Sequence, residues 1–355
     1  MKALGIKENV AFAPLTTFGI GGPARYFIDA PDEQTVLDAI HWAKDRNLLV
    51  FVLGGGSNLL VSDAGFSGLV IKVGISGIQW ATENGKMVVR VGAGEEWDRV
   101  VGLCVERGAA GIECLSGIPG SVGGTPVQNV GAYGQEVSEV LVSVRAYDRS
   151  TDRITELSRD ECGFTYRTST FNTVAKDRYV VLKVTYALTP DGAPTIRYPD
   201  VLREFEGKTA APALAQVRAA VCRIRARKAM LLVEGDPDCR SAGSFFKNPI
   251  ISEKQFAELQ SVAGVGVPRY PGGGSGKVKT AAAWLIEQAG FSKGYSLGSA
   301  GLSTKHTLAL VNKGGAKADD IVRLARQIRA RVRERFGIEL FPEPVFLGFP
   351  NEVLS

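Results

Sequence analysis

The chain has only two histidines, His41 and His306, in 355 residues. A serine, histidine and aspartate triad is therefore nearly excluded, and so is a metal site built from several histidines. Any acid–base chemistry must then fall to serine, tyrosine, lysine, glutamate or cysteine side chains. We interpret both histidines as structural, because neither lies in a glycine-rich loop.

Cysteine is also sparse, with five residues at wide spacing and no Cys-x-x-Cys pair. This pattern fits neither a disulfide framework nor a zinc site, so we expect reduced thiols and no bound metal. The N-terminus has no hydrophobic signal region, and no run approaches the roughly 18 apolar residues of a membrane span. We therefore predict a cytoplasmic protein that does not contact the membrane.

Long runs of a single charge are missing as well. The formal net charge is +5, and lysine and arginine alternate with aspartate and glutamate over most of the length. Proteins that bind nucleic acid carry a basic tail or stripe. We expect no nucleic-acid partner, and a small anionic ligand fits this balance better.

Glycine, in contrast, is abundant, with 42 residues where average usage would give about 25. Many stand in short clusters beside apolar runs, which is typical of loops that bring bare backbone close to a ligand. Alternating patterns predict helices and strands along the chain, with a capped helix start at Ser252 to Gln255. The helices are expected at about 33–46, 95–108 and 317–336, and the strands at about 48–53, 68–73, 86–94, 140–148, 178–188 and 306–312.

Two glycine-rich stretches could bind a ligand. "GGGSN", residues 54–58, follows a predicted strand, where N–H groups can converge on a phosphate, although an ordinary tight turn is an equal alternative. A strand follows it, so it is not a Rossmann fingerprint, and "PGGGSGKV", from Pro271, lacks two required residues of a Walker A loop. "GIPGSVGGTPVQNVGAYG", residues 117–134, is long enough to favour function. Two such loops after strands suggest one dinucleotide held between two subdomains.

These loops and five further stretches closely resemble the UDP-N-acetylenolpyruvoylglucosamine reductase (MurB) family of peptidoglycan synthesis, in order and over nearly the whole chain. The five stretches are "TTFGIGGPARYF", "FTYRTSTF", "AGSFFKNP", "AAWLIEQAGFSKG" and "FPEPVF". The resemblance implies an α+β and α/β fold. It consists of a two-part FAD-binding domain of the vanillyl-alcohol-oxidase (PCMH-like) type and a C-terminal α+β substrate-binding domain. We expect the FAD-binding parts at 1–72 and 73–210, the substrate-binding domain at 211–339, and residues 340–355 packing back on the second part.

The resemblance also implies a reaction. NADPH reduces FAD, and hydride passes from flavin N5 to the enolpyruvyl ether of UDP-N-acetylglucosamine enolpyruvate, which gives UDP-N-acetylmuramate. An enolate-like intermediate beside a carboxylate needs cationic or hydrogen-bonding partners. By motif position, Arg167 and Glu343 match the charge-stabilising pair, and Ser244 matches the proton donor. Without the resemblance, Ser244 would be a turn or helix-cap hydroxyl and the other two a structural ion pair.

Ligand contacts follow in the same way. Tyr198, Lys228 and Asn248 match positions that contact the UDP-sugar, and the chain is of the longer type, whose tyrosine-bearing loop folds over the nucleotide. This sequence departs from the family pattern in two ways: Met230 stands where the family often has proline, and the segment between Lys228 and Ser244 is longer. Of the residues matched to the family, Lys228 is therefore the one whose alignment is least certain. The expected FAD contacts lie in the two loops and are Gly54, Gly55, Gly56, Ser57, Asn58, Gly117, Ile118, Pro119, Gly120, Ser121, Gly124, Asn129, Gly131 and Ala132.

Two other functions stay open on the sequence alone. Another FAD-dependent oxidase or dehydrogenase of the same fold would keep the glycine loops without needing Ser244, Arg167 and Glu343 together. A non-catalytic nucleotide-sugar binding protein would keep the fold but not turnover. We expect a monomer whose partners are UDP-N-acetylglucosamine enolpyruvate and NADPH.

Overall fold

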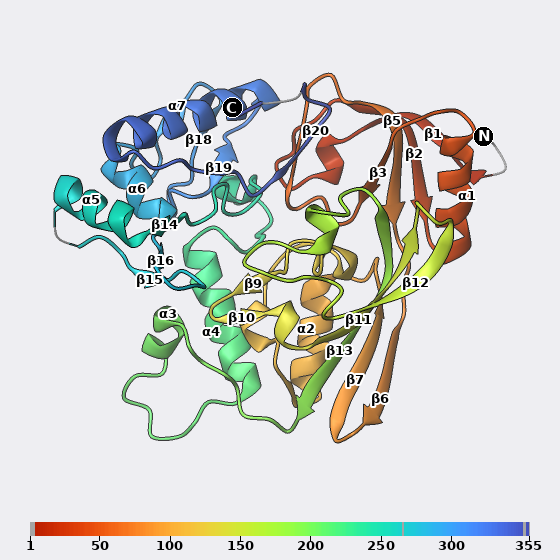
Figure 1. Cartoon of the computed structure of the whole chain (residues 1–355), viewed down its shortest axis with the longest axis horizontal. Helices are drawn as coiled ribbons and strands as arrows, with labels where there is room; N and C mark the ends of the chain where they lie inside the picture. The colour runs from red at the N-terminus through yellow and green to blue at the C-terminus, as the bar shows by residue number, and fades with distance from the viewer. Residues whose placement is uncertain (1–3, 265, 351–352, 355) are drawn as a thin grey trace. The chain divides into compact units, whose positions relative to one another are not determined.

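The computed structural model describes residues 4–264, 266–350 and 353–354. By its internal contacts the chain divides into two compact units, and Figure 1 labels their helices and most of their strands. Unit 1 comprises Met1–Val10, Ala24–Gly56 and Ser67–Arg227, and unit 2 comprises Ala11–Pro23, Ser57–Phe66 and Lys228–Ser355.

Unit 1 begins with a four-stranded sheet in the order β1-β2-β5-β3, with α1 beside it (Figure 1). β3 and β5 are parallel. Helix α1 begins after Asp32, whose carboxylate accepts the Thr35 N–H at 2.7 Å, and it buries Val36, Ala39 and Ile40 in the same core as the strands. The elements are β1 (Lys7–Ala11), β2 (Pro23–Ala30), α1 (Glu33–Lys44), β3 (Val50–Leu53) and β5 (Phe66–Val73).

The larger part of unit 1 is a six-stranded antiparallel sheet in the order β12-β11-β13-β7-β6, with β8 paired to β13. Helix α2 packs in its core through Trp97, whose ring centroid lies 5.7 Å from that of Tyr186 on β13. The elements are β6 (Ile78–Glu83), β7 (Lys86–Gly92), α2 (Trp97–Glu106), β8 (Ala109–Ala110), β11 (Leu141–Asp148), β12 (Arg153–Ser158) and β13 (Tyr179–Pro190).

Short elements connect these strands, and helix α4 closes the unit. Val217, Val221 and Ile224 of α4 form a small apolar cluster with Cys114. This packing places α4 in unit 1, whereas the sequence led us to begin the substrate-binding segment at residue 211. The elements are η3 (Glu113–Leu115), η4 (Val122–Gly124), β9 (Gly131–Ala132), β10 (Gln135–Glu136), η5 (Val137–Glu139), η6 (Thr170–Asn172), α3 (Pro199–Arg203) and α4 (Leu214–Arg227).

Unit 2 packs three helices with two small antiparallel sheets and one parallel strand pair. Helix α5 starts at the predicted capping box, in which Ser252 and Gln255 exchange hydrogen bonds. Helix α7 lies close to the predicted bounds of 317–336 and buries Ile321, Leu324, Ile328 and Val332, so both helix predictions are confirmed. The elements are η2 (Ala13–Leu15), β4 (Leu59–Val61), η7 (Pro237–Cys239), β14 (Ile250–Ser252), α5 (Glu253–Ala263), β15 (Tyr270–Pro271), β16 (Lys277–Lys279), α6 (Ala282–Gln288), β17 (Ser296–Leu297), β18 (Ala300–Leu302), β19 (Leu310–Asn312), α7 (Ala318–Phe336) and β20 (Val345–Leu347).

Two details differ from the expectation. The strand expected at 306–312 is shorter, because β19 begins only at Leu310. The C-terminal segment joins unit 2, since Leu340 lies in its core and β20 pairs in parallel with β4. The division into three domains stays a prediction.

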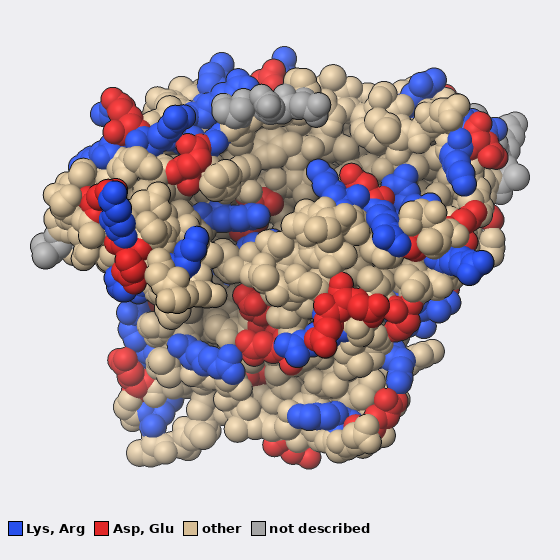
Figure 2. Space-filling model, viewed as in Figure 1, with Lys and Arg blue, Asp and Glu red and all other residues tan. Residues whose placement is uncertain are grey.

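The distribution of charged side chains and the state of the cysteines agree with the sequence analysis. On the face shown in Figure 2, basic side chains are interspersed with acidic ones, and no continuous basic stripe crosses it. One arginine of α7 binds backbone, since Nε of Arg329 donates to the Leu340 carbonyl at 2.9 Å. The five cysteines are free thiols, and burial raises the pKa of Cys104, Cys114 and Cys162 to about 12. No helix among the described residues has the length and apolarity to cross a bilayer.

Candidate active site

The two glycine loops are in direct contact within unit 1. Gly54 to Gly56 follow β3, and a Cβ atom on Gly55 would stand 2.6 Å from the Cα of Gly120. A Cβ on Gly54 would stand 2.5 Å from Oγ of Ser121. Gly56 adopts a φ of 64°, in the left-handed region that favours glycine. Only glycine lets these two backbones approach so closely.

The second loop begins at Gly117, directly after η3 and not after a strand, which corrects the sequence-based expectation. The Gly117 N–H donates to Oδ1 of Asp98 at 2.5 Å, and its carbonyl accepts from Nε of Arg225 at 3.1 Å. Arg218 donates to both carboxylate oxygens of Asp98, at 2.5 and 2.8 Å. Charged side chains therefore hold the backbone of Gly117 from two sides, since its φ of 71° leaves no regular ladder to do so.

Burial and charge act against each other in this anchor. Burial raises the pKa of Asp98, but the hydrogen bonds from Arg218 and the Gly117 N–H outweigh it and leave that pKa below its ordinary value. Arg225 is 9% exposed, and burial lowers its pKa. The Tyr133 hydroxyl lies within hydrogen-bonding reach of Arg225, and burial raises the pKa of this phenol to about 12. The anchor thus combines one carboxylate with two guanidinium groups.

Beyond Gly117 the loop runs beside the N-terminal end of α2. Ser121 forms an antiparallel bridge with Glu96. Gly124 has an open side, because a Cβ atom there would meet nothing within 4 Å. The residues between the two anchored positions are half-buried; they are Ile118, Pro119 and Gly120.

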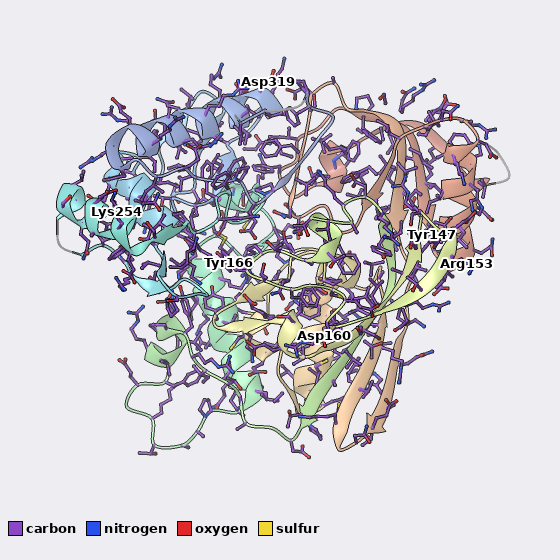
Figure 3. All side chains as sticks on the ribbon, in the orientation of Figure 1. Tyr147, Arg153, Asp160, Tyr166, Lys254 and Asp319 are labelled. Atoms are coloured by element: carbon purple, nitrogen blue, oxygen red, sulfur yellow. The ribbon has the colours of Figure 1, made fainter. Side chains whose placement is uncertain are left out.

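Arg167 lies against the far end of this loop. Its Nη2 donates to the Gly131 carbonyl at 2.7 Å, and Ala132 beside it pairs with Gln135. Tyr166, labelled in Figure 3, places its ring 5.2 Å from the guanidinium carbon. Arg167 has a φ of 55°, which is unusual for a bulky residue and is found where the surroundings impose it, often at functional sites.

Asn129 fixes the turn that brings Gly131 to Arg167. Its φ is 45°, and its side-chain nitrogen donates to Oε2 of Glu136 at 2.8 Å and to the Thr165 carbonyl at 3.1 Å. The second bond joins the glycine loop to the "TYRTS" segment. The structure therefore brings three predicted site residues together in unit 1, namely Asn129, Gly131 and Arg167.

Tyr198 lies over the end of the same loop. Its ring meets that of Tyr133 edge to face, with centroids 5.4 Å apart. Tyr198 also stands immediately before α3, whose first residue is Pro199. The tyrosine-bearing segment is therefore ordered against the glycine loop.

In unit 2, the paired phenylalanines explain the "AGSFF" stretch. Phe245 and Phe246 are each 1% exposed, and the Phe245 ring lies edge to face with that of Phe18. The Phe245 N–H donates to the Leu308 carbonyl at 2.8 Å. Ser244 is half-buried, and its hydroxyl forms no hydrogen bond with the residues that the structure describes. The aromatic pair thus anchors the segment in the core and leaves this hydroxyl available.

Glu343 is held beside Ser244 by backbone bonds. Its N–H donates to the Phe245 carbonyl at 2.9 Å, and Phe246 forms an antiparallel bridge with Pro342. Its carbonyl accepts from Nδ2 of Asn58 at 3.2 Å. The structure therefore gathers Asn58, Ser244 and Glu343 in one part of unit 2.

The other predicted residues of unit 2 are placed differently. Oδ1 of Asn248 accepts the Ala282 N–H at 3.0 Å, so this amide also caps the start of α6. Ser57 accepts a hydrogen bond from Thr17 at its carbonyl, at 3.4 Å. Lys228 directly follows the end of α4, and the lengthened segment after it is closed by Cys239, whose thiol donates to the Leu231 carbonyl.

The residues of unit 1 fit a dinucleotide cofactor such as FAD. A Cβ atom on Gly54 or Gly55 would collide with the neighbouring loop, so the two loops pack closely together here, while Gly124 borders open space. Such backbone offers N–H donors to phosphate oxygens with little steric bulk. A guanidinium group lies at each end of the loop, at Arg225 and Arg167.

Sequence reasoning missed Asp98, Arg218, Arg225 and Tyr133. The three charged residues stand in helical stretches that read as solvated faces. Only the position of Tyr133 inside "GAYG" could have suggested a role, since it lies within the loop singled out for ligand binding.

Comparisons with known proteins agree with this arrangement. A family model of the C-terminal domain of UDP-N-acetylenolpyruvoylglucosamine reductase matches residues 236–347, and a model of an FAD binding domain matches residues 24–158. The chain is similar to UDP-N-acetylenolpyruvoylglucosamine reductase of Thermobifida fusca, with 49% identity over 96% of this chain and 98% of the relative. The same enzyme of Streptomyces coelicolor is 45% identical over 96% of this chain and 90% of the relative.

Among solved structures, the chain is similar to UDP-N-acetylenolpyruvylglucosamine reductase from Thermus caldophilus. The TM-score is 0.66 at 26% sequence identity, and the match covers 96% of this chain and 99% of that chain. Together with the two family models, this match confirms the predicted fold, an FAD-binding part followed by a C-terminal substrate-binding part.

Proposed function

Because the chain belongs to the UDP-N-acetylenolpyruvoylglucosamine reductase family, we propose that it reduces the enolpyruvyl ether of UDP-N-acetylglucosamine enolpyruvate to UDP-N-acetylmuramate, with NADPH as the reductant. The chain is an FAD-dependent oxidoreductase of peptidoglycan synthesis. A cytoplasmic location and a monomeric state are part of the proposal.

The observation that carries this proposal is the hydrogen bond from the Glu343 N–H to the Phe245 carbonyl. It holds the backbone of Glu343 against the segment that contains the half-buried Ser244, whose hydroxyl forms no hydrogen bond with a described residue. An FAD-dependent oxidase of another substrate would not need this pairing. It therefore favours a reaction that consumes both a hydride and a proton.

Each of the expected site residues has a task in this proposal. When bound, FAD supplies hydride transfer, and the two glycine loops would hold it. Negative charge that develops on the enolpyruvyl group is stabilised by the Arg167 guanidinium, with Glu343 as the second member of the charge-stabilising pair. The Ser244 hydroxyl donates a proton to the carbon that bears the ether oxygen. A weak acid suffices there because an enolate beside a carboxylate is strongly basic.

The nucleotide end of the substrate is held by other side chains. Lys228 and the Tyr198 hydroxyl suit the oxygens of a diphosphate. Asn248 already uses its oxygen to cap α6, so its amide nitrogen is the group that donates to the uracil or the sugar. These tasks rest on the family resemblance and on the chemistry of the side chains.

The test follows the flavin colour. Purified protein is mixed with NADPH without oxygen, and UDP-N-acetylglucosamine enolpyruvate is then added while absorbance is recorded at about 450 nm. We expect the colour to be lost with NADPH and to return with the enolpyruvyl substrate. UDP-N-acetylglucosamine, which lacks the enolpyruvyl group, is the control and should not restore the colour.

Each other outcome points to one of the alternatives. Colour that is lost and does not return would overturn the substrate assignment and favour another FAD-dependent oxidase or dehydrogenase. Colourless protein that binds no added FAD would favour a nucleotide-sugar binding protein without turnover.

A further inference from the structure

One buried carboxylate in unit 1 belongs to none of the residues assigned above. Glu113 lies on η3, four residues before Gly117, and is fully buried. Its Oε2 accepts the Gly111 N–H at 2.8 Å, and its Oε1 accepts Nε2 of Gln135 at 2.8 Å and the Thr195 N–H at 3.0 Å. Three donors therefore converge on one side chain, which satisfies a buried charge that would otherwise be costly.

The three donors come from three different segments of unit 1. Gly111 precedes the glycine loop, Gln135 on β10 ends it, and Thr195 stands three residues before Tyr198. The Gln135 side chain also accepts the Cys114 N–H at 2.8 Å, which closes the network. Glu113 thus ties both ends of the loop that fits FAD to the tyrosine-bearing segment.

The tyrosine-bearing segment has other contacts with unit 1 as well. Nη1 of Arg197 donates to the Gly134 carbonyl at 3.4 Å and pairs with Glu139 at 3.2 Å, but the Arg197 side chain is 59% exposed. Water and salt screen such a pair, so it contributes little. The edge-to-face contact of Tyr198 with Tyr133 fixes the rings only after the backbone is in place. Ile196 and Val201 pack against the apolar cluster of α4, and the Cys114 thiol donates to the Thr195 carbonyl at 3.7 Å. The bond from the Thr195 N–H to Glu113 is the buried, charge-assisted hydrogen bond of this segment.

We propose that Glu113 is a positioning residue that holds the tyrosine-bearing segment in its substrate-binding place through the Thr195 N–H. The proposal rests on the proposed function, which makes Tyr198 a substrate contact. Glu113 itself touches neither substrate nor cofactor. It acts by aligning the nucleotide-binding tyrosine with the glycine loop, whose far end accepts a hydrogen bond from Arg167.

The first variant is Glu113→Gln. An amide accepts at one oxygen only, so its NH₂ group must face either the Gly111 N–H or both the Gln135 and Thr195 donors, and the three-donor arrangement is broken in either orientation. We expect KM for UDP-N-acetylglucosamine enolpyruvate to rise roughly tenfold, with kcat changed by less than about threefold and FAD content unchanged. Exchange of the backbone amides at 195–203, measured by mass spectrometry, should become faster in the protein without substrate.

A second variant removes the donor instead of the acceptor. Thr195→Pro lacks the single N–H concerned and keeps the Glu113 carboxylate with its other two donors, so the glycine loop stays anchored. Pro194 already restricts the chain before this position to extended backbone. We expect the same rise in KM and the same faster exchange as in Glu113→Gln.

Asp148→Asn is the matched control, because Asp148 is another buried carboxylate of unit 1 that binds backbone, but at the turn between β11 and β12. It should lower the melting temperature and leave KM and the exchange at 195–203 unchanged. If Glu113→Gln and Thr195→Pro behave in the same way, Glu113 only stabilises the fold and the proposal is overturned. If the parent protein fails to turn over the substrate, the exchange measurement still decides the role of Glu113, while the proposed function fails separately.

Discussion

The two units hold their site residues in different ways. In unit 1 the glycine loop is held by buried charged side chains, with Asp98 and Arg225 on either side of Gly117. In unit 2 the segment with Ser244 is held by backbone hydrogen bonds and by the buried rings of Phe245 and Phe246. The difference follows from conformation, because extended segments bond to their neighbours through backbone, whereas left-handed glycine turns need side chains to satisfy them.

This contrast predicts different results of mutation. In unit 2 a site side chain can be replaced while the backbone bonds that position it remain. In unit 1 a change in the loop or its anchors also disturbs the backbone that would carry the cofactor. Activity and stability should therefore separate in unit 2 and fall together in unit 1.

The largest effect is expected for Ser244→Ala in unit 2. Loss of the proton donor should lower kcat for the enolpyruvyl substrate by roughly 10²–10⁴-fold. The melting temperature, the FAD content and the rate of flavin reduction by NADPH should stay close to those of the parent. Stopped-flow absorbance measures the two half-reactions separately.

Ser241→Ala provides the matched control for that experiment. The Ser241 hydroxyl accepts the Gly243 N–H at 3.2 Å and belongs to the same segment, so its removal tests a structural effect alone. We expect a small loss of stability and little change in kcat. Equal losses of kcat in both variants would contradict the role of Ser244 and the separation proposed for unit 2.

The next effect is expected for Glu343→Gln. The backbone of Glu343 is held by Phe245 and Asn58, so the amide should occupy the same place and leave the fold intact. Loss of one member of the charge-stabilising pair should lower kcat by roughly 10²–10³-fold. A melting temperature lowered as much as the activity would show that this side chain supports the fold instead.

Two glycine variants test the opposite expectation for unit 1. In Gly55→Ala the new Cβ would stand 2.6 Å from Gly120, which pushes the two loops apart. Overpacking of this kind costs about 1–3 kcal/mol, so the melting temperature and the affinity for FAD should both fall, the affinity by roughly tenfold or more. Gly124→Ala meets nothing within 4 Å and should leave the melting temperature unchanged.

Titration of the apoprotein with FAD, followed by flavin fluorescence, measures both variants. If Gly124 borders the cofactor, its alanine variant should weaken binding without any loss of stability. Gly55→Ala protein that binds FAD as tightly as the parent would refute the view that contact between the loops shapes the cofactor site.

Much of the fold could be predicted, because its elements are determined by local patterns. The helix at Glu33 to Lys44 and the strand at Leu141 to Asp148 show their periodicity and boundaries in the sequence. The two glycine loops were also recognisable, since clustered glycine after an apolar run has few structural explanations. Family motifs then pointed to Ser244, Arg167 and Glu343.

The anchors of the site could not be predicted in this way. Arg225 binds Gly117 across 108 positions of sequence, and Glu113 accepts from Thr195 across 82. A charged residue in a helix looks the same in sequence whether it faces solvent or a buried carbonyl, and solvent is the more common case. Such partners are set only when the sheet brings distant segments together.

The smallest expected effect is on the stability of the fold at low pH. It concerns Asp148, a buried carboxylate of unit 1 that is not one of the expected site residues. At the end of β11, near Tyr147 and Arg153 in Figure 3, hydrogen bonds from Arg178 and Ser150 hold the pKa of Asp148 well below its ordinary value. A carboxylate with a lowered folded-state pKa stabilises the fold above its unfolded pKa of about 3.9, and this contribution is lost as the pH falls further.

Asp148→Asn should therefore melt about 2–4 °C below the parent at neutral pH, and the difference should shrink between about pH 4 and pH 2. Thermal melts followed by circular dichroism over this range test it. Unlike Glu113→Gln, this variant should keep its KM, because Asp148 binds the turn between β11 and β12 and not the tyrosine-bearing segment. A melting-temperature difference that stays constant across the whole pH range would show that packing, and not the charge of Asp148, stabilises that turn. Buried charge in unit 1 would then be needed only where it holds the glycine loop.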